Sequence, residues 1–230
     1  MTRTQTINFR QSINYIIFAP LLIAFCYVIV LLEINAPYIY RIFLGGVYNP
    51  EHLSSLFFLI MYVFVGFFAI PYLTARYLIQ LTHKNIGLCL PEINSSLCIS
   101  LTILIGIFIS FGIYFSKLPA FQAYYSFAHI KLPIFIFIQL FFLPIYYFAE
   151  EFFFRGFLFL TLYRFIGWHS YWIADAIFYV AHFNKPTIEL LFSIPAGIGL
   201  NYLALKTKSI YPSMITHASM GFTLNCMMYF

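Results

Sequence analysis

Long runs of apolar residues, separated by short polar segments, set the pattern of this chain. A helix needs about 17–25 apolar residues to cross the hydrocarbon core of a bilayer, where it satisfies its own backbone hydrogen bonds. The pattern therefore predicts an all-α fold, a polytopic transmembrane helix bundle. About seven spans are expected, within a range of six to eight: Tyr15 to Leu32, Leu56 to Leu78, Leu97 to Phe115, Leu132 to Ala149, the short Tyr171 to Ala181, Ile188 to Leu205, and Ile210 to Phe230.

The composition agrees with a membrane location. Of the 230 residues, 63% are hydrophobic and 8% are charged, whereas soluble domains carry about 25% charged residues. We therefore expect an integral membrane protein in contact with the lipid bilayer. The net charge of +5 follows from sparse carboxylates and from basic residues near the predicted span ends, so no basic patch points to nucleic acid as a partner.

The basic residues also predict an orientation. With the N-terminus in the cytoplasm and the spans alternating in direction, most of them fall on the cytoplasmic side, as the positive-inside bias requires. We therefore expect a bacterial inner (plasma) membrane protein with a cytoplasmic N-terminus. The eight inside residues are Arg3, Arg10, Arg76, Lys84, Arg155, Arg164, Lys206 and Lys208, and the four outside residues are Arg41, Lys117, Lys131 and Lys185.

Residues 1–230 are expected to form a single integral-membrane domain. The loops from Asn35 to Ser54 and from Lys117 to Lys131 are too short for a second domain, and the sequence shows neither an internal repeat nor a low-complexity linker. The first apolar run is longer than a signal-peptide core and no A-x-A-like site follows it, so we expect it to be retained as the first helix.

Two adjacent glutamates and an arginine lie in one of the most aromatic parts of the chain, the stretch YFAEEFFFRG. Residues four apart share one helix face, so Glu151 and Arg155 are expected to pair. Glu150 is rotated by about 100° from Glu151, which leaves it free to act in a cavity as a general base or acid. The alternative is that both glutamates lie in water at the membrane surface, but ionisable groups among apolar neighbours are costly and usually functional.

Two histidines on other predicted helices can complete a site. In ADAIFYVAHF, His182 follows Phe178 by one helical turn and Asp175 by two, so the three residues share one face. In SIYPSMITHASMG, His217 lies within the last span. A lone histidine in an apolar helix is more often a core residue than a catalyst, but helices that each carry acid or base groups can converge inside a bundle.

These motifs resemble those of the CPBP family, the CAAX protease and bacteriocin-processing (Abi) intramembrane proteases. EEFFFR is similar to the family motif EExxxR, FYVAH to FxxxH, and AGIGLNYLALKTKSIYPSMITHA to its closing segment. The resemblance covers Leu132 to Phe230 with the motifs in the family's order, which makes 132–230 the expected catalytic core. Residues 1–131 show no such signature and are expected to be divergent N-terminal transmembrane helices.

The resemblance implies a glutamic-type intramembrane endopeptidase that cleaves the tails of membrane-associated peptides or proteins. Glu150 and His182 would activate a water, and Arg155 would hold Glu151. His217 would stabilise the oxyanion formed from the substrate carbonyl.

One position departs from the family pattern. The closing motif is commonly HxxxN, but the position four residues after His217 is Gly221. Asn225 lies eight residues after His217, about 12 Å along a helix axis, which is too far to substitute without a kink. The sequence therefore does not identify the second hydrogen-bond donor to the oxyanion. The positions concerned are Gly221 and Asn225.

Three further alternatives stay open. One alternative is a His₂Glu zinc site, whose composition is matched by Glu150, His182 and His217. A water activated by Glu150 and His182 alone would require no cofactor. A non-catalytic relative, which serves in bacteriocin immunity or partner binding, would explain Gly221. A transporter would also use buried charges, but the paired broken segments typical of transporters are absent from the sequence.

Two expectations concern the surroundings of the site. Glu150, Glu151, Arg155, His182 and His217 should converge on one polar cavity that opens toward the cytoplasmic leaflet. Asp175, directly or through a water, should support the orientation of the His182 ring; the alternative is a helix-start residue at the membrane surface.

Overall fold

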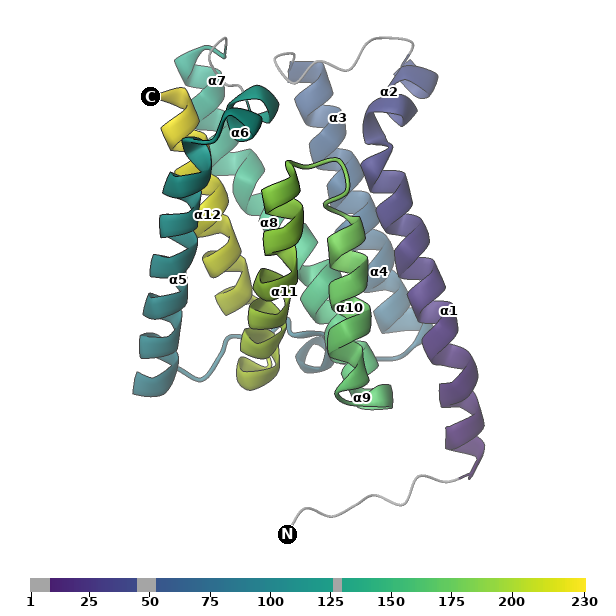
Figure 1. Ribbon diagram of the computed structural model, residues 1–230. Helices are drawn as coiled ribbons and strands as arrows, with labels where there is room; N and C mark the ends of the chain where they lie inside the picture. The colour runs from purple at the N-terminus through teal and green to yellow at the C-terminus, as the bar shows by residue number, and fades with distance from the viewer. Residues whose placement is uncertain (1–8, 45–52, 126–129) are drawn as a thin grey trace.

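Every regular element in the computed structural model is a helix within the residues that it describes, which are 9–44, 53–125 and 130–230 (Figure 1). The all-α fold class predicted from the apolar runs is therefore confirmed. The start of helix α1 and the C-terminus lie at opposite ends of the bundle (Figure 1).

The first half of the chain rises, descends and rises again through the bundle (Figure 1). Its α-helices are α1 (Phe9–Ile34), α2 (Ala36–Leu44), α3 (Leu53–Val63), α4 (Ile70–Leu73), α5 (Ser95–Ser116) and α6 (Pro119–Tyr124). The π-helices η1 (Phe64–Ala69) and η2 (Thr74–Leu78) alternate with α3 and α4 in one continuous rod, and the short 3₁₀ helix η3 (His83–Ile86) follows it.

The second half holds the resemblance to the protease family and forms four rods. The first comprises α7 (Leu132–Phe137), the π-helix η4 (Ile138–Phe142), α8 (Leu143–Glu151), the π-helix η5 (Phe152–Leu160) and α9 (Thr161–Ile166). The other three are α10 (His169–Val180), α11 (Thr187–Thr207) and α12 (Tyr211–Tyr229).

Within the described ranges, five helical stretches have the length and composition to cross a membrane: Ile17–Ile34, Ser54–Leu78, Ser95–Ser116, Leu132–Ile166 and Thr187–Thr207. The two other predicted spans are helical as well, as α10 and α12. The 12 residues of α10 extend only about 18 Å, too short to cross about 30 Å of hydrocarbon. The turn between α10 and α11 accordingly stops short of the upper ends of α3 and α7 (Figure 1).

Close approaches at small residues hold the rods together. A Cβ on Gly112 of α5 would lie 3.0 Å from the Met220 carbonyl oxygen, so the absence of a side chain lets α5 pack directly on α12. A Cβ on Gly156 of η5 would lie 2.5 Å from the Ile86 carbonyl oxygen, which shows why the segment around η3 needs a glycine beside it. Phe153 stacks on Phe67 at 4.6 Å between ring centroids and joins η5 to η1 in the core.

The described structure changes the charge count behind the predicted orientation. Arg155 is 0% exposed and does not mark a membrane surface. Without it the predicted distribution is seven basic residues inside against four outside, in the same direction as before.

Candidate active site

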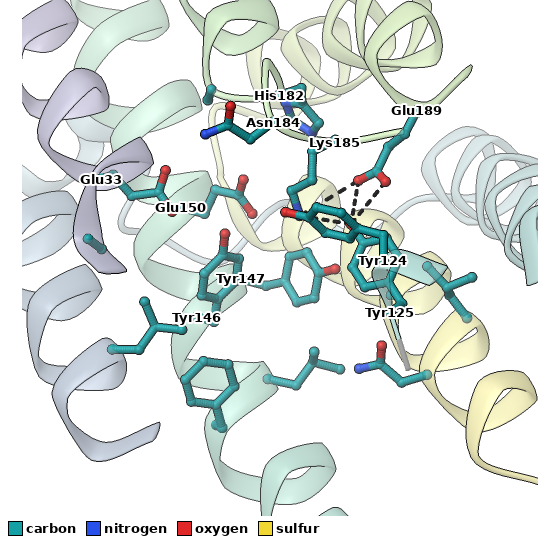
Figure 2. Close-up of a pocket in the computed structure, with 18 of the residues that line it drawn as sticks. Glu33, Tyr124, Tyr125, Tyr146, Tyr147, Glu150, His182, Asn184, Lys185 and Glu189 are labelled. Atoms are coloured by element: carbon teal, nitrogen blue, oxygen red, sulfur yellow. Dashed lines mark hydrogen bonds and ion pairs between the residues drawn. The ribbon is translucent and has the colours of Figure 1, made fainter. Parts of the chain in front are cut away.

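A cavity of about 600 Å³ lies in the interior of the bundle (Figure 2). Glu150 of α8, His182 from the turn after α10, and His217 of α12 all line it. These three residues come from separate rods, as the histidine pattern predicted. Apolar side chains, among them Leu56, Leu59, Phe142 and Leu143, cover much of the remaining wall.

The cavity is lined at one end by residues where α1 ends and α2 begins, the end of the bundle opposite the start of α1 (Figure 1). The leaflet toward which the cavity opens depends on the orientation of the chain, so the opening toward the cytoplasmic leaflet stays a prediction. The fourth span is longer than we expected. We predicted that it ends at Ala149, but the stretch Leu132–Ile166 covers 35 residues, which puts Glu150 near its middle.

Glu151 lies behind the cavity wall and joins two basic groups. Its Oε2 lies 3.3 Å from Nε of Arg155, four residues along the same rod, so the expected ion pair is present. Its Oε1 accepts a hydrogen bond of 2.8 Å from Nδ1 of His217. Glu151 and Arg155 are both 0% exposed. The carboxylate of Glu151 is thus committed to holding other side chains.

Glu150 is left free to face the cavity. The nearer of its carboxylate oxygens lies 3.8 Å from Nδ1 of His217, beyond hydrogen-bond length. The adjacent glutamates therefore differ in the way that their 100° rotation predicted, because Glu151 has close partners and Glu150 lines the open space.

His182 has a fixed orientation. Its Nδ1 lies 2.8 Å from the carbonyl oxygen of Phe178, one helical turn earlier. Because a carbonyl oxygen only accepts, Nδ1 carries the proton of the neutral ring and Nε2 keeps its lone pair. Burial, with the nearby charge of Lys185, lowers the pKa of His182 to about 3, so the ring is neutral at physiological pH.

The Phe178 ring connects the two sides of the site. It meets the His182 ring edge-on at 4.5 Å between centroids and lies 5.9 Å from the His217 ring. The Arg155 guanidinium carbon lies 4.2 Å from its centroid, a distance at which a cation is attracted by an aromatic face. Phe178 thus touches both histidines while it covers the buried arginine.

Asp175 is buried between α10 and α11. It is 5% exposed, within α10, and packs against Gly197 of α11, where an added Cβ would lie 3.1 Å from its Cγ. The Phe178 carbonyl, and not Asp175, accepts the hydrogen bond that orients His182. Support of the His182 ring by Asp175 through a water stays a prediction, whereas the alternative of a helix-start residue at the membrane surface is wrong, because the side chain is buried in the bundle.

Asn225 is not brought to the position of the family asparagine. The helix α12 is continuous from Tyr211 to Tyr229, without the kink that such a substitution needs. Nδ2 of Asn225 instead donates a hydrogen bond of 3.4 Å to Oε1 of Gln139, near the far end of the cavity.

Several cavity residues were missed in the sequence. Nζ of Lys185 donates a 2.8 Å hydrogen bond to the Tyr125 hydroxyl, which in turn donates to Glu189 at 2.8 Å (Figure 2). Glu33 projects from α1 on the opposite side (Figure 2). Two signals were available in the sequence: the four-residue spacing of Lys185 and Glu189, and the acid that directly follows the first apolar run. No sequence signal pointed to Tyr125.

A metal version of the site finds no support in the donor geometry. Among the described residues, no group of three or more His, Cys, Asp or Glu side chains is arranged to hold a metal ion. Glu150, His182 and His217 line one cavity but do not form such a group, and Nδ1 of His217 is already bonded to Glu151. We therefore derive no chemical step through zinc.

Comparison with known proteins supports the motif assignment. The family model described as type II CAAX prenyl endopeptidase Rce1-like matches residues 129–223. This range contains both glutamates, Arg155 and both histidines, and it leaves the earlier helices outside the match. Neither the curated proteins nor the solved structures contain a match to the chain. The resemblance to the CPBP proteases is thereby confirmed, because residues 129–223 match the Rce1-like type II CAAX prenyl endopeptidase model.

Proposed function

We propose that the protein is an intramembrane endopeptidase that hydrolyses a peptide bond in the tail of a membrane-anchored peptide or protein. One observation carries the proposal. Glu150, His182 and His217 line a single cavity, while Glu151 and Arg155 form a buried pair behind it. A base, a second acid–base group and a group able to polarise a carbonyl are the parts that amide hydrolysis needs.

The nucleophile in this proposal is a water between Glu150 and His182. The Glu150 carboxylate takes one proton from this water, and the lone pair on Nε2 of His182 accepts a hydrogen bond that orients it. Support comes from the tautomer of His182, because its Nδ1–H is bonded to Phe178 and Nε2 is the nitrogen left over.

The oxyanion is stabilised by His217. Glu151 holds Nδ1 of His217, so Nε2 is the ring nitrogen left for the substrate, and in this proposal it donates from the protonated ring. A protonated His217 and Arg155 together balance the two adjacent carboxylates, and such pairing is required where charges are buried. Attack forms the C–O bond and moves the carbonyl electron pair onto oxygen.

Collapse of this intermediate restores the carbonyl and breaks the C–N bond. The proton taken up by Glu150 then passes to the leaving amine. One water is consumed, one new carboxyl group and one amine are formed, and Glu150 returns to its starting state. The apolar wall of the cavity suits a substrate that arrives from the bilayer.

The test is cleavage of membrane-embedded peptides by the purified protein in nanodiscs, with products identified by mass spectrometry. Glu150→Gln should abolish cleavage. Glu92→Gln makes the same chemical change at an exposed position outside the cavity and should cleave at the wild-type rate. Equal rates for the two variants would refute the role of Glu150.

A second candidate rests on Gly221, where the family pattern has asparagine. A non-catalytic relative would bind membrane peptides in the same cavity and release them intact. Saturable binding of peptides by wild-type protein, without cleavage in a broad panel and without any effect of Glu150→Gln, would favour this candidate.

A further inference from the structure

The space beside Gly221 is filled by the side chain of Tyr147. A Cβ built on Gly221 would lie 2.7 Å from Cζ and 3.0 Å from Cε2 of Tyr147, and would overlap its hydroxyl oxygen. Gly221 is one helical turn after His217, so its face of α12 is where the second residue of the HxxxN pattern would project. The Tyr147 hydroxyl therefore occupies the position left vacant by the missing asparagine side chain.

Tyr147 also stands beside the other groups of the site. It lies on α8 one turn before Glu150 and Glu151, and Figure 2 shows it on the same wall of the pocket as Glu150. Its ring meets the His217 ring edge-on at 4.7 Å between centroids. The residue lines the cavity, and its hydroxyl forms no hydrogen bond with another residue in the described ranges. A hydroxyl donor next to His217 is thus available to a ligand.

We propose that Tyr147 is a catalytic residue whose hydroxyl replaces the asparagine amide as the second hydrogen-bond donor to the oxyanion. This inference rests on the proposed endopeptidase function and explains how the site works with Gly221. When water adds to the scissile carbonyl, negative charge develops on its oxygen. Tyr147 Oη–H and His217 Nε2–H both donate to that oxygen, and neither proton is transferred. When the C–N bond breaks, both hydrogen bonds weaken as the carbonyl re-forms.

Glycine at position 221 is a requirement of this arrangement. Any side chain there would displace the Tyr147 ring, because the contact involves Cζ and Cε2 as well as the hydroxyl. The tyrosine and the glycine therefore act as one unit that takes the place of a single asparagine. A purely space-filling role for Tyr147 would need the ring alone, and phenylalanine would serve equally well.

The first experiment removes only the hydroxyl. Tyr147→Phe should lower kcat about 10²–10³-fold, the cost of losing one preorganised oxyanion donor. KM should stay within about twofold, because the lost bond forms only in the transition state. Tyr163→Phe is the matched control, since it removes a hydroxyl from the same rod outside the cavity. Its kcat should equal that of the wild type, and melting temperatures confirm folding.

The second experiment exchanges the unit for the family pattern. Gly221→Asn alone should be inactive or unstable, because asparagine and Tyr147 compete for one space. Tyr147→Ala alone should be as slow as Tyr147→Phe. The double variant Tyr147→Ala/Gly221→Asn should recover at least tenfold in kcat over Tyr147→Ala, because the amide then fits and donates.

The outcomes separate the two proposals. Cleavage by wild type together with Tyr147→Phe at the wild-type rate would overturn the inference and leave the endopeptidase function standing. A double variant no faster than Tyr147→Ala would also count against the inference. Wild-type protein that cleaves nothing in the panel would overturn the proposed function, and the role of Tyr147 with it.

Discussion

Oε1 of Glu151 lies 2.8 Å from Nδ1 of His217, although 66 residues separate them in the chain. The contact ties α8 to α12 through a fully buried carboxylate. It also fixes which His217 nitrogen faces the cavity. This contact gives the two adjacent glutamates different roles, because Glu151 holds the site together and Glu150 is available to react.

Exchange of each glutamate for glutamine should separate these roles. Glu150→Gln should abolish turnover and leave the melting temperature near that of the wild type. Glu151→Gln should lower the free energy of unfolding by about 3–5 kcal/mol, because it leaves Arg155 without its ion-pair partner in the interior. Thermal melts in detergent provide the measurement, and equal melting temperatures of the two variants would contradict the assignment.

Acid should destabilise the protein through His182. The unfolded ring has a pKa of 6.5 and burial lowers it to about 3 in the folded protein. The contribution of the neutral His182 ring to the free energy of unfolding is therefore complete above about pH 6.5. It declines as the pH falls toward 3, since the unfolded state binds a proton first. Between pH 6.5 and 5 the free energy of unfolding should fall by about 2 kcal/mol.

The matched variant for this pH effect is His182→Gln. It removes the titrating ring, so melting temperatures measured from pH 7.5 to 5 should fall less steeply than in the wild type. The same slope in both proteins would show that His182 does not titrate in this way.

Gly197→Ala should disturb the support of the site from a distance. The new methyl group would lie 3.1 Å from Cδ1 of Phe178 and would overlap a carboxylate oxygen of Asp175. Overpacking of this kind costs about 1–3 kcal/mol, and cleavage should slow because Phe178 orients His182. Gly199→Ala, on the same helix with open space around the added Cβ, should melt no lower than the wild type.

Chelation should leave cleavage unchanged. The proposed mechanism uses Glu150, His182 and His217 directly on water and substrate, and these residues do not form a metal-binding group in the described structure. A zinc chelator such as phenanthroline, added before the peptide, should therefore not reduce the rate. Inhibition that is reversed by added zinc would refute the metal-free mechanism.

Apolar run length was enough to predict the helices, but not where the fourth span ends. Glu150, Glu151 and Arg155 looked like the polar border of a span that ends at Ala149. In the structure the helix continues to Ile166, because the charge of Glu151 is balanced by Arg155 within the rod. A hydropathy pattern counts each charge separately and has no information on whether it is paired.

In the candidate site, contacts within one helix could be predicted from the sequence, whereas contacts between helices could not. The Glu151–Arg155 pair and the Phe178–His182 contact span four residues, and helical periodicity predicted that each pair shares a face. The fit of Tyr147 against Gly221 depends on which helices are neighbours. The sequence showed the missing asparagine but not what fills its place.

The buried pair on α8 and η5 also bears on how the chain enters the membrane. An isolated charged residue at the centre of an inserting helix costs about 2.5–3.5 kcal/mol. Glu151 and Arg155 are partners within one segment, so they can neutralise one another during biogenesis, before α12 has been synthesised. At this depth Glu150 is then the one carboxylate of the segment without a partner. The free-energy cost of inserting a charge therefore arises from the residue that we propose as the catalytic base.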